Sequence, residues 1–320
     1  MARRFVMEFE RPLVELEEKL ASLKRLHVSD QPELAAEIAE LEAEIGRLHE
    51  TLYAALTPWE RVQISRHPER PKTDDYLAAL FADVVELHGD RLAGDDEAMF
   101  AGLASFGGRR VAVLGHRKGK NTNENVRRNF GSPHPEGFRK AERVMRLADR
   151  FGIPIVTFLD TAGAYPGIEA EERGQAISIA ECLATLSAVR VPVVVIGIGE
   201  GGSGGALAIG FGDRLIMLEN AYYSVISPEM CATILHKDAR RASEASTCLQ
   251  LTAADLVGFG LADTVVAEPR GGAHRDPETV FSGVREALSA ALDALSAADR
   301  STLPDTRYER LRRIGEIAGA

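Results

Sequence analysis

The chain has 320 residues, of which 45% are hydrophobic and 27% are charged. This length and composition fit a folded globular protein with one large domain and an appendage. The formal net charge of -10 argues against general nucleic-acid binding. We expect a cytoplasmic protein without a signal peptide or membrane span, because no apolar run approaches the roughly 20 residues that a span needs. The three cysteines lie far apart, so we expect no metal site in this chain.

Residues 1–56 are predicted to form a helical hairpin. Apolar residues recur there at spacings of three and four, which gives each helix one apolar seam. Asp30 and Glu33 are placed as a capping box around Pro32, at the start of the second helix. We expect the hairpin to pack on its own chain or on a partner subunit, with no direct part in chemistry. The seam residues are Leu13, Leu16, Leu20 and Leu23, then Leu34, Ile38, Leu41, Ile45, Leu48 and Leu52.

The remainder of the chain divides into a linker, a main domain and a tail. Residues 57–72 carry three prolines and several charges, which indicates a linker. The main domain spans residues 73–300, and residues 301–320 form a C-terminal tail. The apolar runs of the main domain show no alternation and are separated by helical segments, as in a sheet that is buried on both faces. The fold class is therefore α/β.

The elements of the main domain follow from capping residues and apolar runs. Residues 73–89 are predicted to form one helix, capped by Thr73, and residues 102–116 form two strands around a glycine turn. Two helix–strand units follow, and their strands end at Asp160 and at a glycine cluster. Near the end of the chain, a short strand at ADTVVAE precedes a helix near residues 277–295.

The glycine cluster GIGEGGSGGALAIG occupies residues 197–210, and seven of its 14 residues are glycine. One interpretation is a dinucleotide fingerprint, because Gly199, Gly201 and Gly204 spell G-x-G-x-x-G. Glu219, 20 residues beyond Gly199, has the spacing of the acid that binds ribose in such sites. The helix that follows has room for only about two turns, which is short for a crossover helix.

A second interpretation is a nucleophile elbow, since Gly201 to Gly205 match G-x-S-x-G with Ser203 at the centre. Such a serine needs a histidine and an acid, and His236 and His274 follow in a permitted order. The structural alternative is that Ser203 caps the helix that follows, its hydroxyl accepting from a free N–H of the first turn. We favour the cap.

A third interpretation is an amide cradle. Glycines let the backbone approach a ligand, and the first turn of a helix leaves N–H groups without partners. Two such groups aimed at one oxygen form an oxyanion hole, which needs no side-chain nucleophile, base or metal. The alternative is a glycine turn that only packs helix against strand.

Several long motifs, taken in order, resemble one family, the alpha subunits of bacterial acetyl-CoA carboxylase carboxyltransferases. RHPERP, RRNFGSPHPEGFRKA and the N-terminal helical pair match as well, so the resemblance covers essentially the whole chain. The motifs are DTAGAYPG (160–167), AEERGQ (170–175), GEGGSGGALAIG (199–210), YSVISPE (223–229) and EPRGGAHRDP (268–277).

The resemblance implies a crotonase-like fold, a spiral of strand–strand–helix units preceded by the N-terminal hairpin. It also implies an α2β2 assembly with a beta subunit that carries a zinc ribbon. The implied reaction moves a carboxyl group from carboxybiotin, held on the biotin carboxyl carrier protein and loaded by biotin carboxylase, to acetyl-CoA. The product is malonyl-CoA, in the first committed step of fatty acid synthesis. A different acyl-CoA, such as propionyl-CoA, is the alternative substrate.

The same resemblance assigns roles to two loops. The amides of Gly204 and Gly205 are expected to bind the ureido oxygen of biotin, and the enolate oxygen is left to the beta subunit. The loop residues Gly163, Ala164 and Tyr165 are expected to bind biotin. Gly201 and Gly202 are expected to bind it from the glycine cluster.

Two further features of the sequence remain open. Residues 116–140 hold seven Lys or Arg against two Glu. One interpretation is an anion site or a docking face for an acidic partner. The other is a solvated loop, or salt bridges at a subunit interface. Ala162, Met230 and His236 stand where proline, glycine and tryptophan are usual in the family. These departures leave the reaction class unchanged and put the acyl preference in question.

Overall fold

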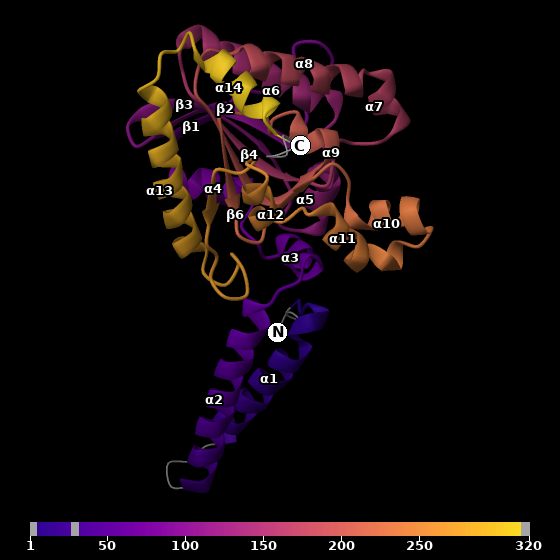
Figure 1. Cartoon of the computed structure of the whole chain (residues 1–320), viewed down its shortest axis with the longest axis vertical. Coiled ribbons are helices and arrows are strands. Elements are labelled where there is room, and N and C mark those ends of the chain that lie inside the picture. The colour runs from indigo at the N-terminus through magenta and orange to yellow at the C-terminus, as the bar shows by residue number, and fades with distance from the viewer. Residues whose placement is uncertain (1–4, 27–31, 315–320) are drawn as a thin grey trace.

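The structure, a computed structural model, describes residues 5–26 and 32–314. Figure 1 shows an N-terminal helical hairpin that projects from a body built around one β-sheet. In the described part of the chain the strands are β1 (Ala82–Glu86), β2 (Met99–Phe106), β3 (Arg109–His116), β4 (Ile155–Thr161), β5 (Val193–Gly202), β6 (Arg214–Leu218), β7 (Tyr222–Ser224) and β8 (Thr264–Val266).

The sheet has the order β1-β2-β3-β4-β5-β6-β8, and β7 pairs with the end of β5. The first three strands are antiparallel, and the later pairings are parallel. β4 and β5 are buried along their whole length, as expected for strands covered on both faces. β5 pairs with β6 through residues 194–197 and with β7 through residues 200–202, so its glycine-rich end leaves β6 and meets a different neighbour.

Helices cover both faces of this sheet. Adjacent residues of a strand point to opposite faces. On one face Phe158 of β4 packs on Tyr76, which also meets Phe281; on the other, the hydroxyl of Thr157 donates to the carbonyl of Ile209. The helices are α1 (Arg11–Leu26), α2 (Pro32–Ala54), α3 (Pro58–Ser65), α4 (Thr73–Leu80), α5 (Thr122–Arg127), α6 (Pro135–Phe151), α7 (Ile168–Glu172), α8 (Gln175–Ala188), α9 (Ser203–Leu207), α10 (Pro228–His236), α11 (Ala242–Leu249), α12 (Ala253–Gly258), α13 (Pro277–Ser296) and α14 (Leu303–Arg312).

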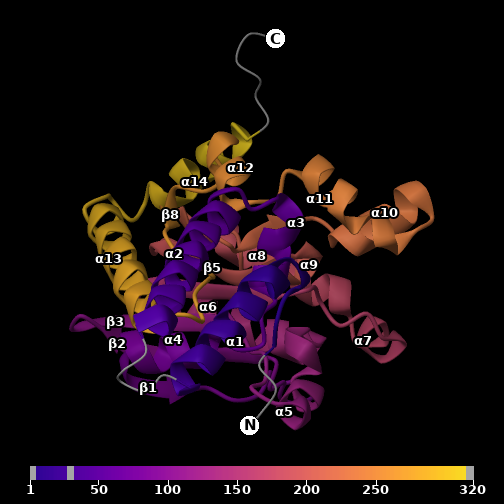
Figure 2. The same cartoon turned by 90° about the horizontal axis from the view of Figure 1, so that it is seen from below.

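The predicted hairpin is confirmed, with α1 and α2 lying side by side in both views (Figures 1 and 2). Leu13 and Leu41 are buried, and the other described seam residues are half-buried. At the base of the hairpin, the Tyr53 hydroxyl donates to Glu10 at 2.5 Å, and Arg275 lies 3.6 Å from the same carboxylate. The hairpin is thus tied to the body through the end at which α1 begins and α2 ends. The capping box that involves Asp30 lies outside the described residues.

The single helix predicted over residues 73–89 is wrong. α4 ends at Leu80, and residues 82–86 form β1, the antiparallel edge strand of the sheet. The β-branched Val84 and Val85 suit a strand, and pairing with β2 outweighs the helical spacing. The cap also differs, because Lys72 occupies the N-cap position and the Thr73 hydroxyl donates to a carbonyl on β3.

The segments interpreted as linker and tail both contain helices. α3 lies within residues 57–72 and begins with a capping box. α14 lies within residues 301–320, and its Arg307 is fully buried, bonded to both carboxylate oxygens of Asp213 at 2.9 Å and to the carbonyl of Val189 at 3.0 Å. The division into a linker, a main domain and a tail stays a prediction.

Removal of the Arg307 guanidinium is expected to destabilise the fold strongly, because it leaves the buried carboxylate of Asp213 without its cation. We expect Arg307→Met to lower the free energy of unfolding by about 3–5 kcal/mol. The exposed Arg312 on the same helix is the control, and Arg312→Met should change it by less than about 0.5 kcal/mol. Urea titration of both variants measures the difference, and equal stabilities would show that α14 is not anchored by this pair.

Candidate functional site

The glycine cluster forms the junction between β5 and α9. Gly202 occupies the N-cap position of α9, and as a glycine it has no side chain to cap the helix. Ser203 follows with φ of 54° and is exposed, so the interpretation of Ser203 as the helix cap is wrong. The physical reason is the left-handed backbone at this sharp strand-to-helix turn, which puts the serine one position inside the helix.

The two predicted loops meet backbone against backbone. A Cβ on Gly202 would lie 2.1 Å from the carbonyl oxygen of Ala162, and a Cβ on Gly205 would lie 2.4 Å from the nitrogen of Ala164. Gly163 has φ of +153°, which also favours glycine. Gly204 differs, because its Cβ would meet only Ile179 at an ordinary 3.6 Å. The structure therefore brings the glycine cluster together with Gly163 and Ala164, as the sequence predicts.

Local contacts hold the side chain of Tyr165 in place. Its ring lies 4.2 Å from the ring of His134, and its N–H donates to the carbonyl of Pro133 at 3.0 Å. A hydrogen bond to Glu169 raises the pKa of the exposed Tyr165 hydroxyl. Gly201 packs against β7, where its Cβ would lie 2.8 Å from the carbonyl oxygen of Tyr222.

His116, which the sequence analysis did not single out, contacts both loops from the end of β3. Its Nδ1 accepts the N–H of Asp160 at 3.4 Å, so Nε2 carries the proton and donates to the carbonyl of Gly205 at 3.1 Å. Burial lowers the pKa of His116 to about 4, so the ring is neutral near pH 7. The imidazole therefore acts as a fixed link between the end of β4 and α9.

Lys118 lies two residues further along and binds two carboxylates. Its Nζ is 2.8 Å from Asp160 Oδ1 and 2.6 Å from Glu200 Oε2. Glu200 also receives Arg66 Nε and the Tyr222 hydroxyl, at 2.6 and 2.9 Å. Burial alone would raise the pKa of Glu200, but Lys118 and Arg66 lower this pKa to about 2. The spacing His-x-Lys at a strand end, followed by acids at the ends of the next two strands, is the signal that sequence reasoning missed.

The basic segment 116–140 is neutralised within the chain. Each of its seven cations lies within 4.0 Å of a carboxylate. Arg127 has the longest of these contacts, 3.8 Å to Glu97, and is exposed. The segment's positive charge therefore balances acids of the same chain, which argues against an open anion site; the salt bridges lie within the chain and not at a subunit interface, where the sequence predicted them. The pairs are Arg117–Asp74, Lys118–Asp160, Lys120–Asp75, Arg127–Glu97, Arg128–Asp74, Arg139–Asp90 and Lys140–Asp95.

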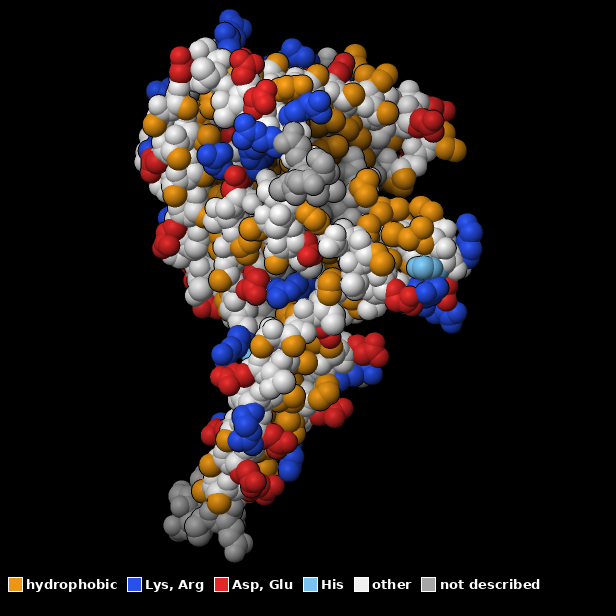
Figure 3. All heavy atoms as spheres, viewed as in Figure 1, with side chains coloured by type: hydrophobic (Ala, Val, Ile, Leu, Met, Phe, Trp, Pro, Cys, Tyr) orange, Lys and Arg blue, Asp and Glu red, His pale blue; other side chains and the backbone are white. Residues whose placement is uncertain are grey.

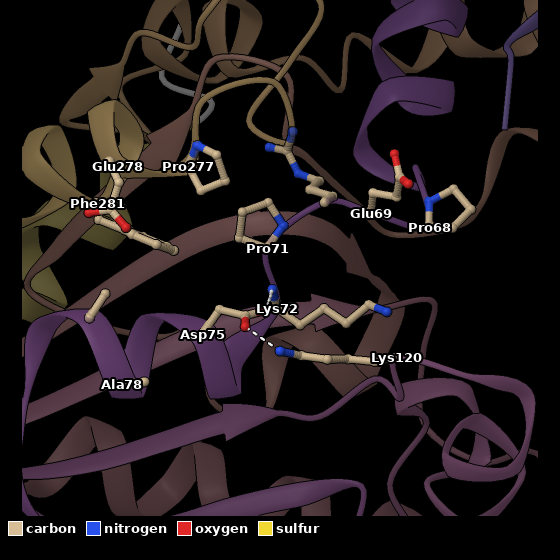
Figure 4. A pocket seen from close by; sticks show the side chains of 12 residues that line it. Pro68, Glu69, Pro71, Lys72, Asp75, Ala78, Lys120, Pro277, Glu278 and Phe281 are labelled. Carbon is tan, nitrogen blue, oxygen red and sulfur yellow. Dashed lines mark hydrogen bonds and ion pairs between the residues drawn. The ribbon is translucent and has the colours of Figure 1, made fainter. Parts of the chain in front are cut away.

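Two cavities lie near these residues. One of about 300 Å³ is lined by Ala162, Asp160, Lys118 and Glu200 among others, so it opens beside the loop that follows β4. The second, of about 560 Å³, lies between the 68–72 segment, α4 and the start of α13 (Figure 4). In Figure 4 the side chains of Lys72 and Lys120 extend along one wall of this cavity, and Lys120 binds Asp75.

The residues needed by the other two interpretations of the cluster are engaged elsewhere. Glu219, the candidate ribose ligand, accepts the N–H of Glu268 at 3.1 Å and pairs with Arg61 at 3.4 Å. His274 stacks on another histidine with ring centroids 3.7 Å apart, and His236 ends α10.

No group of three or more His, Cys, Asp or Glu side chains in the described ranges is arranged to hold a metal ion. No helix that the structure describes is long and apolar enough to cross a membrane.

Similarities in shape define the class of protein. The chain resembles the transcarboxylase 12S, with a TM-score of 0.57 and 20% identity over 71% of this chain and 42% of that one. It also resembles a chain of a Pseudomonas malonate decarboxylase hetero-tetramer in complex with coenzyme A, with a TM-score of 0.58 and 17% identity over 74% and 95%. The chain has the crotonase-like fold of such enzymes.

The family follows from closer relatives. The profile of the acetyl co-enzyme A carboxylase carboxyltransferase-like family matches residues 6–315. The acetyl-coenzyme A carboxylase carboxyl transferase subunit alpha of Thermus thermophilus is 51% identical over 312 residues, 98% of this chain and 99% of the relative. The subunit of the same name from Acidithiobacillus ferrooxidans is 52% identical over 314 residues, 98% of each chain. The chain belongs to this family, as its motifs predict.

The neutral state of His116 predicts how stability depends on pH. Its folded pKa of about 4 lies below the ordinary 6.5, so the unfolded chain binds the proton more readily between these values. This contribution is complete above about pH 6.5 and is lost as the pH falls toward 4. We expect the wild type to lose about 2 kcal/mol more than His116→Gln between about pH 7.5 and pH 5. Urea titrations at both pH values measure this, and identical losses would contradict the assignment.

Proposed function

We propose that this chain is the alpha subunit of the carboxyltransferase of a biotin-dependent acetyl-CoA carboxylase. It transfers the carboxyl group of carboxybiotin to acetyl-CoA and gives malonyl-CoA. The observation that carries the proposal is the family membership over nearly the whole chain, with both family loops in contact. The departures at Ala162 and Met230, both exposed, do not favour another acyl-CoA over the acetyl group.

The proposed chemistry uses backbone donors in place of side chains. Carboxybiotin supplies the activated carboxyl group, and loss of that group leaves negative charge on the ureido oxygen. The N–H groups of Gly204 and Gly205, in the first turn of α9, have no acceptor within the helix and stabilise this charge. The enolate oxygen of acetyl-CoA is left to the beta subunit, so this chain supplies one half of the donors.

The residues around α9 fit a flat ureido group. Gly202 and Gly205 have no room for a Cβ, and the facing loop offers the small residues Ala162, Gly163 and Ala164. These three are at least partly exposed, so a ring can reach the amides from that side. Tyr165 and Gly201 complete the proposed biotin site, Tyr165 at the rim beside His134.

The proposal also includes partners outside this chain. A beta subunit with a zinc ribbon completes an α2β2 enzyme, and biotin is delivered by its carboxyl carrier protein after loading by biotin carboxylase.

Support within this chain comes from the exposed hydrophobic residues of α7, α8, α9, α10 and the segment just before α10, here termed the apolar rim. Figure 3 shows hydrophobic side chains gathered over this side of the molecule. The apolar rim consists of Ile168, Ile177, Leu207, Val225, Met230, Ile234 and Leu235.

The function is tested by carboxyl transfer in the reverse direction, from malonyl-CoA to free biotin, with acetyl-CoA as the measured product. The assay compares this chain alone with this chain co-purified with its beta subunit. Activity only in the complex supports the split site. A well-formed complex that is inactive with malonyl-CoA but active with methylmalonyl-CoA would favour the propionyl-CoA alternative, and one inactive with both would overturn the proposal.

Substitution at Gly205 is expected to disable the amide cradle. A side chain there meets the backbone of Gly163 and Ala164, so Gly205→Val must separate the two loops. We expect kcat to fall at least 100-fold, roughly the loss of one oxyanion donor or more. Gly258→Ala, at a position where a Cβ meets nothing within 4 Å, is the control and should retain activity. Near-normal turnover by an assembled Gly205→Val complex would refute the assignment.

A charge in the apolar rim is expected to weaken assembly. Ile234 is 57% exposed on α10, and burying a carboxylate against an apolar partner is unfavourable. We expect Ile234→Glu to raise the Kd for the beta subunit about tenfold or more. Val85→Glu, at a similarly exposed residue on the edge strand β1, is the matched control. Equal affinities of the two variants, measured by titration calorimetry, would place the beta subunit elsewhere.

A further inference from the structure

The ends of β4 and β5 are joined by one ammonium group. Lys118, just beyond the end of β3, contacts Asp160 of β4 and Glu200 of β5 at 2.8 and 2.6 Å. Asp160 also contacts β5 directly, since the backbone N–H of Glu200 donates to Asp160 Oδ1 at 3.2 Å. Each acid immediately precedes one of the two loops that contain the proposed biotin residues.

We propose that Lys118 is a positioning residue that sets the relative placement of the loop after β4 and the glycine cluster. The inference rests on the proposed function, because the placement matters only if both loops act on one ligand. Lys118 acts through Asp160 and Glu200, which fix where Ala162–Gly163 and Gly201–Gly202 leave the sheet. The donors of α9 then face the small residues of the opposite loop at a fixed separation.

The packing around the three side chains leaves little freedom. A Cβ on Gly199 would lie 2.4 Å from Asp160 Oδ1, and one on Gly131 would lie 2.8 Å from Lys118 Cγ. Asp160 and Glu200 are 5% and 7% exposed. Glycine is thus needed on two sides to admit the network, and on another side the two acids and Lys118 line the cavity of about 300 Å³. The close contacts at Gly199 and Gly131 limit how far the network can yield when Lys118 shifts.

Lys118 is bound by acids on two strands, which distinguishes it from a cation that awaits an anion. Neighbouring charge raises its pKa, so the ammonium persists at any pH at which the enzyme is handled. Charged and titratable groups from every side act on the network. Around Glu200 they are Arg66, Tyr222 and, through Arg66, Glu229; around Asp160 and Lys118 they are Arg70, Lys72 and His116.

The test uses Lys118→Met and Lys118→Arg in the assembled complex with the beta subunit. Lys118→Met keeps the length and removes the charge, and we expect kcat to fall roughly 10- to 100-fold with KM for malonyl-CoA nearly unchanged. Lys118→Arg keeps donors for both acids and should recover most of the activity. Lys140→Met is the matched control. Lys140 lies on α6, and its fully buried side chain pairs with Asp95 at 2.6 Å. It should lower stability and leave kcat per assembled complex unchanged.

A pH profile separates positioning from a merely structural role. Without the ammonium, Glu200 loses one of the two cations that hold its pKa low, so burial raises that pKa. Protonation of Glu200 then removes a buried charge that has lost part of its compensation. We expect the ratio of Lys118→Met to wild-type kcat to rise as the pH falls from about 8 to about 6. The ratio for Lys140→Met should stay flat.

The outcomes distinguish this inference from the proposed function. An inactive wild-type complex overturns the function itself. An active wild type with a Lys118→Met complex of equal kcat overturns the positioning role. If Lys118→Met does not assemble, the charge-balanced Lys118→Met/Asp160→Asn variant replaces it, and normal kcat in that variant also overturns the role. A raised KM with unchanged kcat would show that Lys118 contacts the substrate instead.

Discussion

The close approach of two backbones, at the ends of β4 and β5, is the constraint on which the site depends. Gly202 and Gly205 face Ala162 and Ala164 at separations that leave no space for a side chain. Because parallel strands end at the same edge of a sheet, this contact forms only when both strands are fully buried and correctly aligned. The core therefore determines the position of the amides that we propose as donors to the ureido oxygen.

Charge in this protein is organised around that contact. Half-buried cations that follow β3 and α3 meet acids at the strand ends, and His116 adds a neutral link to the carbonyl of Gly205. An ion pair that has lost its water is favourable only when its remaining partners are satisfied. Glu200 meets this condition through Lys118, Arg66 and Tyr222 together. The basic segment, conspicuous in an acidic sequence, is used to balance such acids.

The outer surface has a different organisation. Figure 2 shows α7, α9 and α10 on one side of the body, away from β1, and the exposed hydrophobic residues of the apolar rim belong to this side. Exposed hydrophobic residues that gather on one side of a chain are typical of a surface that binds another protein. The malonate decarboxylase chain, which comes from a hetero-tetramer, shares the fold over 74% of this chain. The hairpin extends from another part of the body.

The sequence by itself determined the fold class, the hairpin, the strands β2 to β5 and the family, because apolar spacing and long motifs are local properties. It also located the glycine loops, although the amide roles stay a prediction. Tertiary structure decided what depends on contacts between distant residues. Residues 82–86 form β1 and not a helix because they pair with β2. Ser203 is not the helix cap because its backbone is left-handed. Lys118 contacts Asp160 and Glu200 only because the fold brings three strands together. Spacing in one chain cannot show such contacts, since they depend on alignment across a sheet.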